Sequence, residues 1–599
     1  MDAAEVPVCK VTPVRSGQPT VLRLAVPWRW AALPRLGLGR ATVFEVAAVT
    51  LVVGTFSWVC FQQLSRPGLY GDEAWSAVHA AKFALGRPVI DPSRYHQVSL
   101  LGHTFPFMMN EYVGPVKSYV LAAAFAVFGV NEIVLRLTTS LIGLLGILIF
   151  YLLARQEFGR LAAGMSALLL GTDLSYILAV RSDWGPFALA TLARVASLWL
   201  LLGWYRARQR WWLLFLGSAS LGLGLSHKFD FLAFVVAVII AGTLCYGRAA
   251  RPRIEEIALA AAGFLAGAWP ILLYNLLTRG QTLAAGGQLA ATNVKVAFMP
   301  APSEAWSFIQ ALPTDVFNRQ NVLDTLLDGT AVANWLVGEH LELVTPLGPS
   351  PLPLALKFAP VLILLGIVAH RSWQWLRSVA FFATAYALTL VLIAATPIAT
   401  GPHHALALYP LPHLFVGVAL AGLCRGGAAV PAWLAWLGRG ASAAGLAFIV
   451  VSSLLLARTF HERLALVGGD RYWSESIYEL YDALRGPYQG QAVELLDWGF
   501  EQPLVILGRD EFQLDAAYWR ILADENSVGW LARGLAAPKY VFVLRADEFT
   551  FDKRIGERFQ AAYQSQPNLG IAERRFFQNN GKYAFSVFQF SSAEPPARR

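Results

Sequence analysis

Long apolar stretches separated by short polar segments fill residues 41–456 of the chain. Many of these stretches approach the roughly 20 residues that an α-helix needs to cross a bilayer. The first runs over residues 41–61, directly after a basic segment. The pattern predicts a polytopic α-helical membrane protein with about 11 transmembrane helices.

Basic residues in the loops predict how these helices are oriented. Lys and Arg gather after alternate apolar stretches, for example at residues 206–210 and 248–253. Cytoplasmic loops carry such an excess, so we expect these loops and the N-terminal tail, residues 1–40, on the cytoplasmic side. The first outer loop, residues 62–132, and the long outer loop, residues 279–353, are then extracytoplasmic.

One apolar segment of the first outer loop does not fit a membrane span. Residues 115–130 are too few to cross the bilayer, and they include Lys117. A span at this position would also reverse the side of the basic loops that follow it. We therefore expect a helix that lies in the outer membrane interface.

The pattern changes at about residue 457, where charged residues become frequent. Short alternating segments predict strands with helices between them. The strands are expected at residues 492–496, 540–544 and 583–590. Strands that alternate with helices predict a small α/β domain over residues 457–599, which an odd number of spans places outside the cytoplasm. Asp497-Trp498-Gly499 is interpreted as a turn of this domain.

The composition agrees with a membrane protein and narrows its partners. Of the 599 residues, 56% are hydrophobic and 15% are charged, whereas soluble domains are about half apolar and a quarter charged. The formal net charge of +9 follows from the basic loops, so we expect no nucleic-acid partner. The four cysteines are scattered along the chain and predict neither a disulfide framework nor a zinc site.

An acidic pair, Asp72 and Glu73, follows the first apolar stretch closely. A carboxylate at a membrane boundary needs water, a cation or a partner, which favours a functional role. The alternative is that Asp72 caps a helix starting at Ala74, with Glu73 in its first turn. One residue can do both, and we expect Asp72 to cap this helix and to take part in chemistry.

Further stretches follow this pair in a recognisable order. After Gly71-Asp72-Glu73, Tyr112-Val113-Gly114-Pro115 opens the interfacial helix. Leu135-Arg136-Leu137 then begins an apolar run that reaches Phe158-Gly159, and Lys228 follows the fifth span. Over about the first 250 residues, this order resembles the GT-C superfamily of membrane glycosyltransferases. Within it, the chain is most similar to the branch of protein O-mannosyltransferases and aminoarabinose transferases (family 39-like).

The resemblance implies transfer of a sugar from a polyprenyl-phosphate-linked donor to an acceptor hydroxyl on a lipid, glycan or protein. It also implies inversion at the sugar and a site on the extracytoplasmic face. Asp72 would be the general base, and Glu73 would orient the acceptor or Asp72. The alternatives are a secondary transporter or lipid flippase, or a non-catalytic membrane scaffold. Transport is disfavoured because the two halves show no repeat.

Cationic side chains should face the phosphate, because a glycosyl phosphate departs as an anion. Lys228 and His227 lie at an outer boundary where a lipid phosphate would lie, although Lys228 can also reach the headgroups by snorkelling. His227 can equally be an interfacial polar residue. His403 and His404 stand where related enzymes often carry Arg, a departure that makes phosphate binding sensitive to pH. His413 falls inside a predicted span, where a satisfied core histidine is expected.

Another charged outer loop holds Arg181 and Asp183. Asp183 matches, in loop order, an acidic residue that some GT-C enzymes hold near the donor or a metal. Arg181 is a candidate for the donor phosphate, but these two residues can instead pair with each other. A divalent cation, Mg²⁺ or Mn²⁺, could bind Asp183 and the acidic pair through oxygen ligands, and a metal-free base mechanism fits equally well.

The short loops and the Arg/Ala/Leu-rich composition favour a bacterial inner membrane. In a eukaryote, the same topology would place the site in the lumen of the endoplasmic reticulum.

Overall fold

The computed structural model describes residues 40–87, 97–100, 103–282, 284, 305–338, 340–369, 373–395, 402–425, 430–537 and 539–592. Residues 45–599 form one compact unit, to which all contacts given below belong. The predicted N-terminal tail, residues 1–40, lies outside the described residues except for Arg40.

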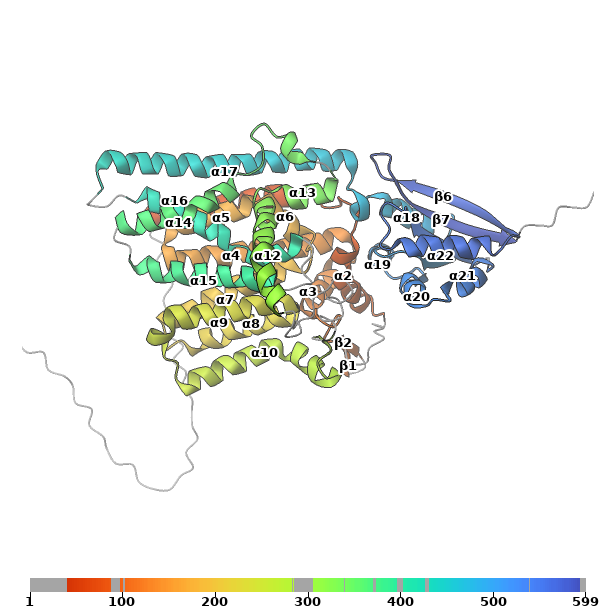
Figure 1. The fold of residues 1–599 in the computed structure, drawn as a ribbon, viewed down its shortest axis with the longest axis horizontal. Coiled ribbons are helices and arrows are strands. Elements are labelled where there is room, and N and C mark those ends of the chain that lie inside the picture. The colour runs from red at the N-terminus through yellow and green to blue at the C-terminus, as the bar shows by residue number, and fades with distance from the viewer. Residues whose placement is uncertain are drawn as a thin grey trace, which may run out of the picture. The chain divides into compact units, whose positions relative to one another are not determined.

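Apolar helices make up most of the first 467 residues (Figure 1). They are α1 (Arg40–Cys60), α4 (Glu132–Phe158), α5 (Arg160–Thr172), α6 (Leu174–Arg181), α7 (Phe187–Arg206), α8 (Trp211–His227), α9 (Leu232–Ala250), α10 (Ile254–Thr278), α12 (Ala305–Leu327), α13 (Thr330–Val337), α14 (Leu352–Ala369), α15 (Gln374–Ala394), α16 (Leu411–Cys424) and α17 (Ala432–Val467). Short 3₁₀ helices lie between them, including η1 (Phe229–Phe231), η2 (Leu341–Leu343) and η3 (Pro402–Leu408).

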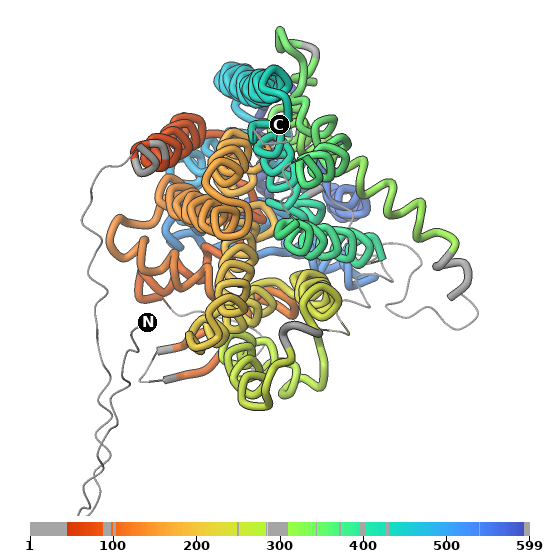
Figure 2. The backbone as a smooth tube through the Cα atoms, turned by 90° about the vertical axis from the view of Figure 1, so that its left-hand side faces the viewer, coloured from red at the N-terminus to blue at the C-terminus, as the bar shows by residue number. Residues whose placement is uncertain are grey.

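Within the described residues, seven helices are long and apolar enough to cross a bilayer, and the bent pair α5 and α6 makes eight if it is one span. This confirms the predicted polytopic α-helical class. The total of about 11 spans stays a prediction. Helix α8, which ends next to Lys228, packs against both α7 and α10, as the yellow and yellow-green segments of Figures 1 and 2 show.

The apolar segment over residues 160–181 is broken at Asp173, where α5 and α6 meet at a bend of 63°. One carboxylate oxygen of Asp173 accepts the backbone N–H of Tyr176 at 2.8 Å and so caps α6. The other accepts the Tyr409 hydroxyl at 3.1 Å and lies 2.9 Å from Nε2 of His413. His413 is a fully buried core histidine, as expected, but only its Nε2 is paired: its Nδ1 has no hydrogen-bond partner among the described residues.

The first outer loop contains helix α2 (Gly71–Ala84), the hairpin β1 (Gln97–Leu100) and β2 (His103–Pro106), and helix α3 (Val116–Phe128). The predicted helix start at Ala74 with Asp72 as its cap is wrong. Helix α2 begins at Gly71, and its N-cap residue is Tyr70. Both acidic residues therefore lie in the first turn, where the helix dipole favours negative charge. Helix α3 forms as expected, and its place in the membrane interface stays a prediction.

The C-terminal region contains a five-stranded sheet in the order β4-β3-β5-β7-β6. Its elements are η4 (Arg471–Trp473), α18 (Ser476–Arg485), β3 (Ala492–Leu495), α19 (Glu501–Leu507), β4 (Leu514–Asp515), α20 (Tyr518–Ala523), α21 (Ser527–Leu535), β5 (Tyr540–Arg545), α22 (Lys553–Gln564), β6 (Leu569–Phe577) and β7 (Tyr583–Ser592). Strand β3 is parallel to β4 and β5, whereas β7 is antiparallel to β5 and β6. The three predicted strands are thus confirmed.

Two strands of this sheet were not predicted. Strand β4 has only two residues, and β6 carries five consecutive exposed residues and so lacks the alternation of a half-buried strand. The predicted domain boundary at residue 457 falls inside α17, which continues without a break to Val467.

Candidate functional site

Asp72 lies in the first turn of α2 and is partly exposed. The Tyr70 hydroxyl donates a hydrogen bond of 3.0 Å to its Oδ2. Burial of the carboxyl raises the pKa of Asp72, while the Tyr70 hydrogen bond and the charges of Lys228 and Lys117 act in the opposite direction, and the net shift is upward. A partly exposed carboxylate with a raised pKa is suited to accept a proton.

Glu73, in contrast, is fully buried and bound to Arg136 of α4. The guanidinium donates from Nε to Oε1 at 2.6 Å and from Nη2 to Oε2 at 2.9 Å. Its Nη1 also donates to the carbonyls of Leu64 and Pro67, both at 2.9 Å. Because both oxygens of Glu73 are taken, this pair fastens α2 and the preceding loop to the membrane helices.

Arg181 and Asp183 do not pair with each other. Asp183 is buried and lies 2.6 Å from Nζ of Lys117, and its Oδ1 accepts the backbone N–H of Ala188 at 2.7 Å. Arg181 is also buried and donates to the carbonyls of Gln63 and Arg66. Arg181 therefore holds the loop between α1 and α2, and Asp183 holds Lys117 of α3.

Lys228 lies in a cluster with both candidate histidines. Its Nζ is 2.8 Å from Oδ2 of Asp230, and Nδ1 of His404 is 3.5 Å from the same oxygen. The His403 ring lies against the His404 ring at 4.2 Å and against Trp184 at 4.9 Å between centroids. The first outer loop reaches the same cluster through a backbone bridge between Val113 and Lys228.

The surroundings of both histidines in this cluster favour the neutral imidazole. Burial lowers the pKa of His403 well below its usual value, and the neighbouring His404 and Lys228 lower it further. Burial also lowers the pKa of His404, although its hydrogen bond to Asp230 opposes this shift. His227 is buried outside this pairing, with Nε2 3.1 Å from the carbonyl of Pro186.

Asp72 lies near the Lys228 cluster, because the charge of Lys228 acts on its carboxyl. The charges of Lys228 and Lys117 act on Asp72. Burial raises the pKa of Tyr112, and the negative charges of Asp72 and Asp230 raise it further, so Tyr112 stands near both. The site thus has a carboxylate on one side and a lysine with two neutral imidazoles on the other, an arrangement that can accept a proton and bind an anion.

Some of the residues that the structure places at this site were not assigned a role there from the sequence. Tyr70 and Asp230 carry no pattern of their own. Lys117 and Arg136 do carry a signal, because each is a charged residue flanked by apolar residues of its helix and is buried with a carboxylate partner.

Most carboxylates of the candidate site are bound to basic side chains. Within the described residues, no group of three His, Cys, Asp or Glu side chains could hold a metal ion. Glu73, Asp183 and Asp230 are each paired with a basic side chain, whereas the carboxylate of Asp72 is bound by the Tyr70 hydroxyl.

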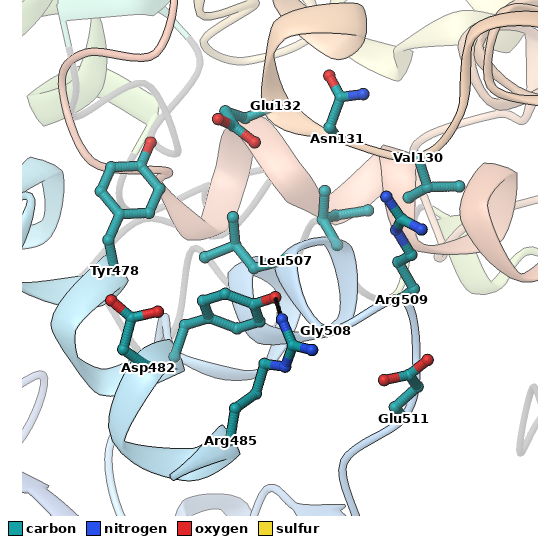
Figure 3. Close-up of a pocket in the computed structure, with 12 residues that line it drawn as sticks. Val130, Asn131, Glu132, Tyr478, Asp482, Arg485, Leu507, Gly508, Arg509 and Glu511 are labelled. Atoms are coloured by element: carbon teal, nitrogen blue, oxygen red, sulfur yellow. Dashed lines mark hydrogen bonds between the residues drawn. The ribbon is translucent and has the colours of Figure 1, made fainter.

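A separate cavity of about 450 Å³ lies between the start of α4 and the C-terminal sheet region (Figure 3). Its polar lining includes Glu132, Asp482, Arg485 and Arg509. None of its lining residues belongs to the group around Asp72 and Lys228, so the two places are distinct.

Comparison with known proteins identifies the fold. Residues 112–274 match the family model of dolichyl-phosphate-mannose-protein mannosyltransferases. This segment includes Lys117, Asp183 and Lys228 but not Asp72. A search of curated proteins finds no match.

Solved membrane enzymes share the architecture of the whole chain. The crystal structure of ArnT from Cupriavidus metallidurans bound to undecaprenyl phosphate is 14% identical, with a TM-score of 0.55 over 91% of this chain and 98% of that one. Its apo form is 15% identical, with a TM-score of 0.56 over 92% and 98%. The Archaeoglobus fulgidus oligosaccharyltransferase tethered with an acceptor peptide is 13% identical, with a TM-score of 0.50 over 92% and 75%. These structures show that the chain has the GT-C fold, and the family match confirms the predicted enzyme class, a membrane glycosyltransferase.

Proposed function

We propose that the chain transfers a sugar from a polyprenyl-phosphate-linked donor to an acceptor hydroxyl on a lipid, glycan or protein, with inversion. The observation that carries this proposal is that the carboxyl of Asp72 lies within the electrostatic influence of Lys228, whose ammonium is paired with Asp230. The undecaprenyl phosphate bound to ArnT supports a lipid phosphate as part of the donor. The peptide tethered to the archaeal enzyme supports an acceptor at the same kind of site.

Asp72 acts as the general base in this proposal. Its carboxylate takes the proton of the acceptor hydroxyl while the acceptor oxygen attacks the anomeric carbon from the face opposite the phosphate. The bond from the anomeric carbon to the phosphate oxygen breaks, and the lipid phosphate leaves as an anion. A positioned base contributes about 10²–10⁴-fold to the rate.

Lys228 stabilises the negative charge that develops on the leaving phosphate. His403 and His404 are neutral, so they contribute hydrogen bonds rather than charge. Arg181 is assigned to the loop before α2 rather than to the phosphate, because its guanidinium is bound to the carbonyls of that loop. Asp183 acts by holding Lys117 at the site.

The site and the C-terminal domain are proposed to face the extracytoplasmic side of a bacterial inner membrane. The basic loops that carry Arg206 and Arg208 would then be cytoplasmic. No divalent cation is given a step, because the carboxylates that could bind one are paired with Lys and Arg.

A panel of polyprenyl-phosphate sugars tests the proposal and identifies the donor. The purified chain is expected to release lipid phosphate from one donor, and EDTA is expected to leave the rate unchanged. A rate that falls with EDTA and returns with Mg²⁺ or Mn²⁺ would overturn the metal-free mechanism. No release from any donor, combined with movement of labelled lipid across sealed vesicles, would instead favour the flippase alternative.

The pH dependence of the reaction should show one acidic limb. Asp72 must be ionised to accept a proton, so kcat/KM falls as the pH drops through its pKa, which burial raises above the usual range of an aspartic acid. The lowered pKa values of His403 and His404 predict no further change between about pH 6 and 8. A second limb near pH 6.5 that disappears in His404→Gln would contradict this.

A further inference from the structure

The C-terminal domain reaches the residue that precedes the proposed base. The Tyr70 ring is almost fully buried and lies 4.3 Å from the Trp473 ring and 5.7 Å from the Trp498 ring between centroids. The Tyr472 ring is 6.2 Å away. Three aromatic residues that follow α17 therefore surround a side chain of the first outer loop.

The backbone of this loop is in equally close contact with the C-terminal domain. The N–H of Gly68 donates to the carbonyl of Trp473 at 2.7 Å. A Cβ atom on Gly68 would lie 2.0 Å from the carbonyl oxygen of Ser474, so only glycine allows this approach. Nε of Arg66 lies 3.0 Å from Oε1 of Glu475. These contacts fix the distance between the loop and the domain.

Arg545 at the end of β5 connects the aromatic residues to the sheet. Its guanidinium lies over the rings of Tyr472 at 4.5 Å and Phe500 at 4.1 Å. Its Nη2 donates to the carbonyl of Trp498 at 3.1 Å. Cation–π contacts of a buried guanidinium are among the stronger ones. The position of the Tyr70 ring is thus set by the folded sheet.

We propose that the C-terminal domain positions Asp72 through Tyr70. The rings of Trp473 and Trp498 hold the Tyr70 ring, and the Tyr70 hydroxyl holds Oδ2 of Asp72 at 3.0 Å. This inference rests on the proposed function, in which Asp72 is the base. Tyr70 is a positioning residue, because it acts on the reaction through Asp72.

The hydrogen bond has two consequences for the reaction. It stabilises the ionised carboxylate, and so it lowers the pKa of Asp72 against the upward effect of burial. It also fixes the rotamer of the side chain, and among the described residues no donor is bound to Oδ1. That oxygen is available for the proton of the acceptor.

The test is the pH profile of kcat/KM for Tyr70→Phe, measured on the full chain with the donor identified in the panel. Phe keeps the ring in its aromatic surroundings and removes only the hydroxyl. The acidic limb is expected to move to higher pH by about one unit. The reason is that the free energy of a hydrogen bond to a charged carboxylate corresponds to a change of about one unit in the pKa of Asp72. The turnover number at neutral pH is expected to fall about tenfold.

Tyr478→Phe is the matched control. The Tyr478 hydroxyl donates to the carbonyl of Ser65 at 2.7 Å, so this variant loses a hydrogen bond to the same loop but none to Asp72. Its acidic limb should coincide with that of the wild type. Trp498→Phe loosens the packing around Tyr70 without removing the hydroxyl, and its limb should move in the same direction as that of Tyr70→Phe but less far.

Two outcomes would overturn the inference. One is a Tyr70→Phe profile that coincides with that of Tyr478→Phe. The other is a Trp498→Phe variant whose acidic limb in the pH profile lies at the wild-type pH. This second result decides the question if Tyr70→Phe does not fold. Asp72→Asn distinguishes these outcomes from a failure of the proposed function. If Asp72→Asn is active, Asp72 is not the base and the proposed function fails. If Asp72→Asn is inactive but Tyr70→Phe has a wild-type pH profile, only the positioning role of Tyr70 is refuted.

Discussion

Asp72→Asn is expected to lower the turnover number of sugar transfer by about 10²–10⁴-fold. Asn is nearly isosteric with Asp, and its amide oxygen can still accept the hydrogen bond of the Tyr70 hydroxyl. The amide cannot accept the acceptor proton, however, so the variant keeps the geometry of the site and loses the chemical step. Binding of the donor lipid should stay close to wild type, because the proposed phosphate site is the Lys228 cluster, which this variant leaves intact.

The measurement is the rate of lipid-phosphate release under saturating donor and acceptor, together with the dissociation constant of the donor. Asp482→Asn is the matched control, because Asp482 lines the separate cavity (Figure 3), whose lining includes neither Asp72 nor Lys228. It should retain the wild-type rate. A rate for Asp72→Asn within threefold or so of that control would show that another group takes the proton.

The sequence was sufficient for those parts of the fold and site that carry a local pattern. Apolar stretches of spanning length predicted α4 and α7, and alternation predicted β3, β5 and β7. Asp72 and Lys228 stood out because they are charged residues beside apolar segments. In each case the pattern that predicts the helix, strand or charged residue lies within about 20 consecutive residues.

The partners of these residues could not be predicted, because they are distant in sequence. Arg136 was part of a motif, but nothing local shows that its guanidinium binds Glu73, 63 residues away. Pairing of Arg181 with Asp183 was the simplest expectation for neighbouring charges. The structure instead pairs Asp183 with Lys117 and turns Arg181 to backbone carbonyls, because a buried ion must find its partner within the packed helices.

The contacts of the C-terminal domain with the first outer loop could not be predicted from the sequence either. Asp497-Trp498-Gly499 was interpreted as a turn, and Trp498 does follow β3 closely. Its contact with Tyr70 joins residues that are far apart in the chain. Packing of α19 against α2 (Figure 1) helps to bring them together, and such packing leaves no periodic signal in either segment.

Arg136→Met is expected to cause the largest loss of stability, about 3–5 kcal/mol. The substitution leaves Glu73 buried without its cation and frees the carbonyls of Leu64 and Pro67. The double variant Arg136→Met/Glu73→Leu should recover part of this loss, because an apolar pair of similar volume removes the unpaired charge. Thermal unfolding in detergent measures both effects.

An exposed ion pair supplies the control for this experiment. Arg458 and Glu462 lie 2.8 Å apart with most of each side chain in solvent, and exposed pairs contribute little to stability. Arg458→Met should therefore have the melting temperature of the wild type. If Arg136→Met has the same melting temperature as well, the Glu73 pair does not fasten α2. If the double variant is no more stable than Arg136→Met, the loss comes from the freed carbonyls of the loop, and not from the charge of Glu73.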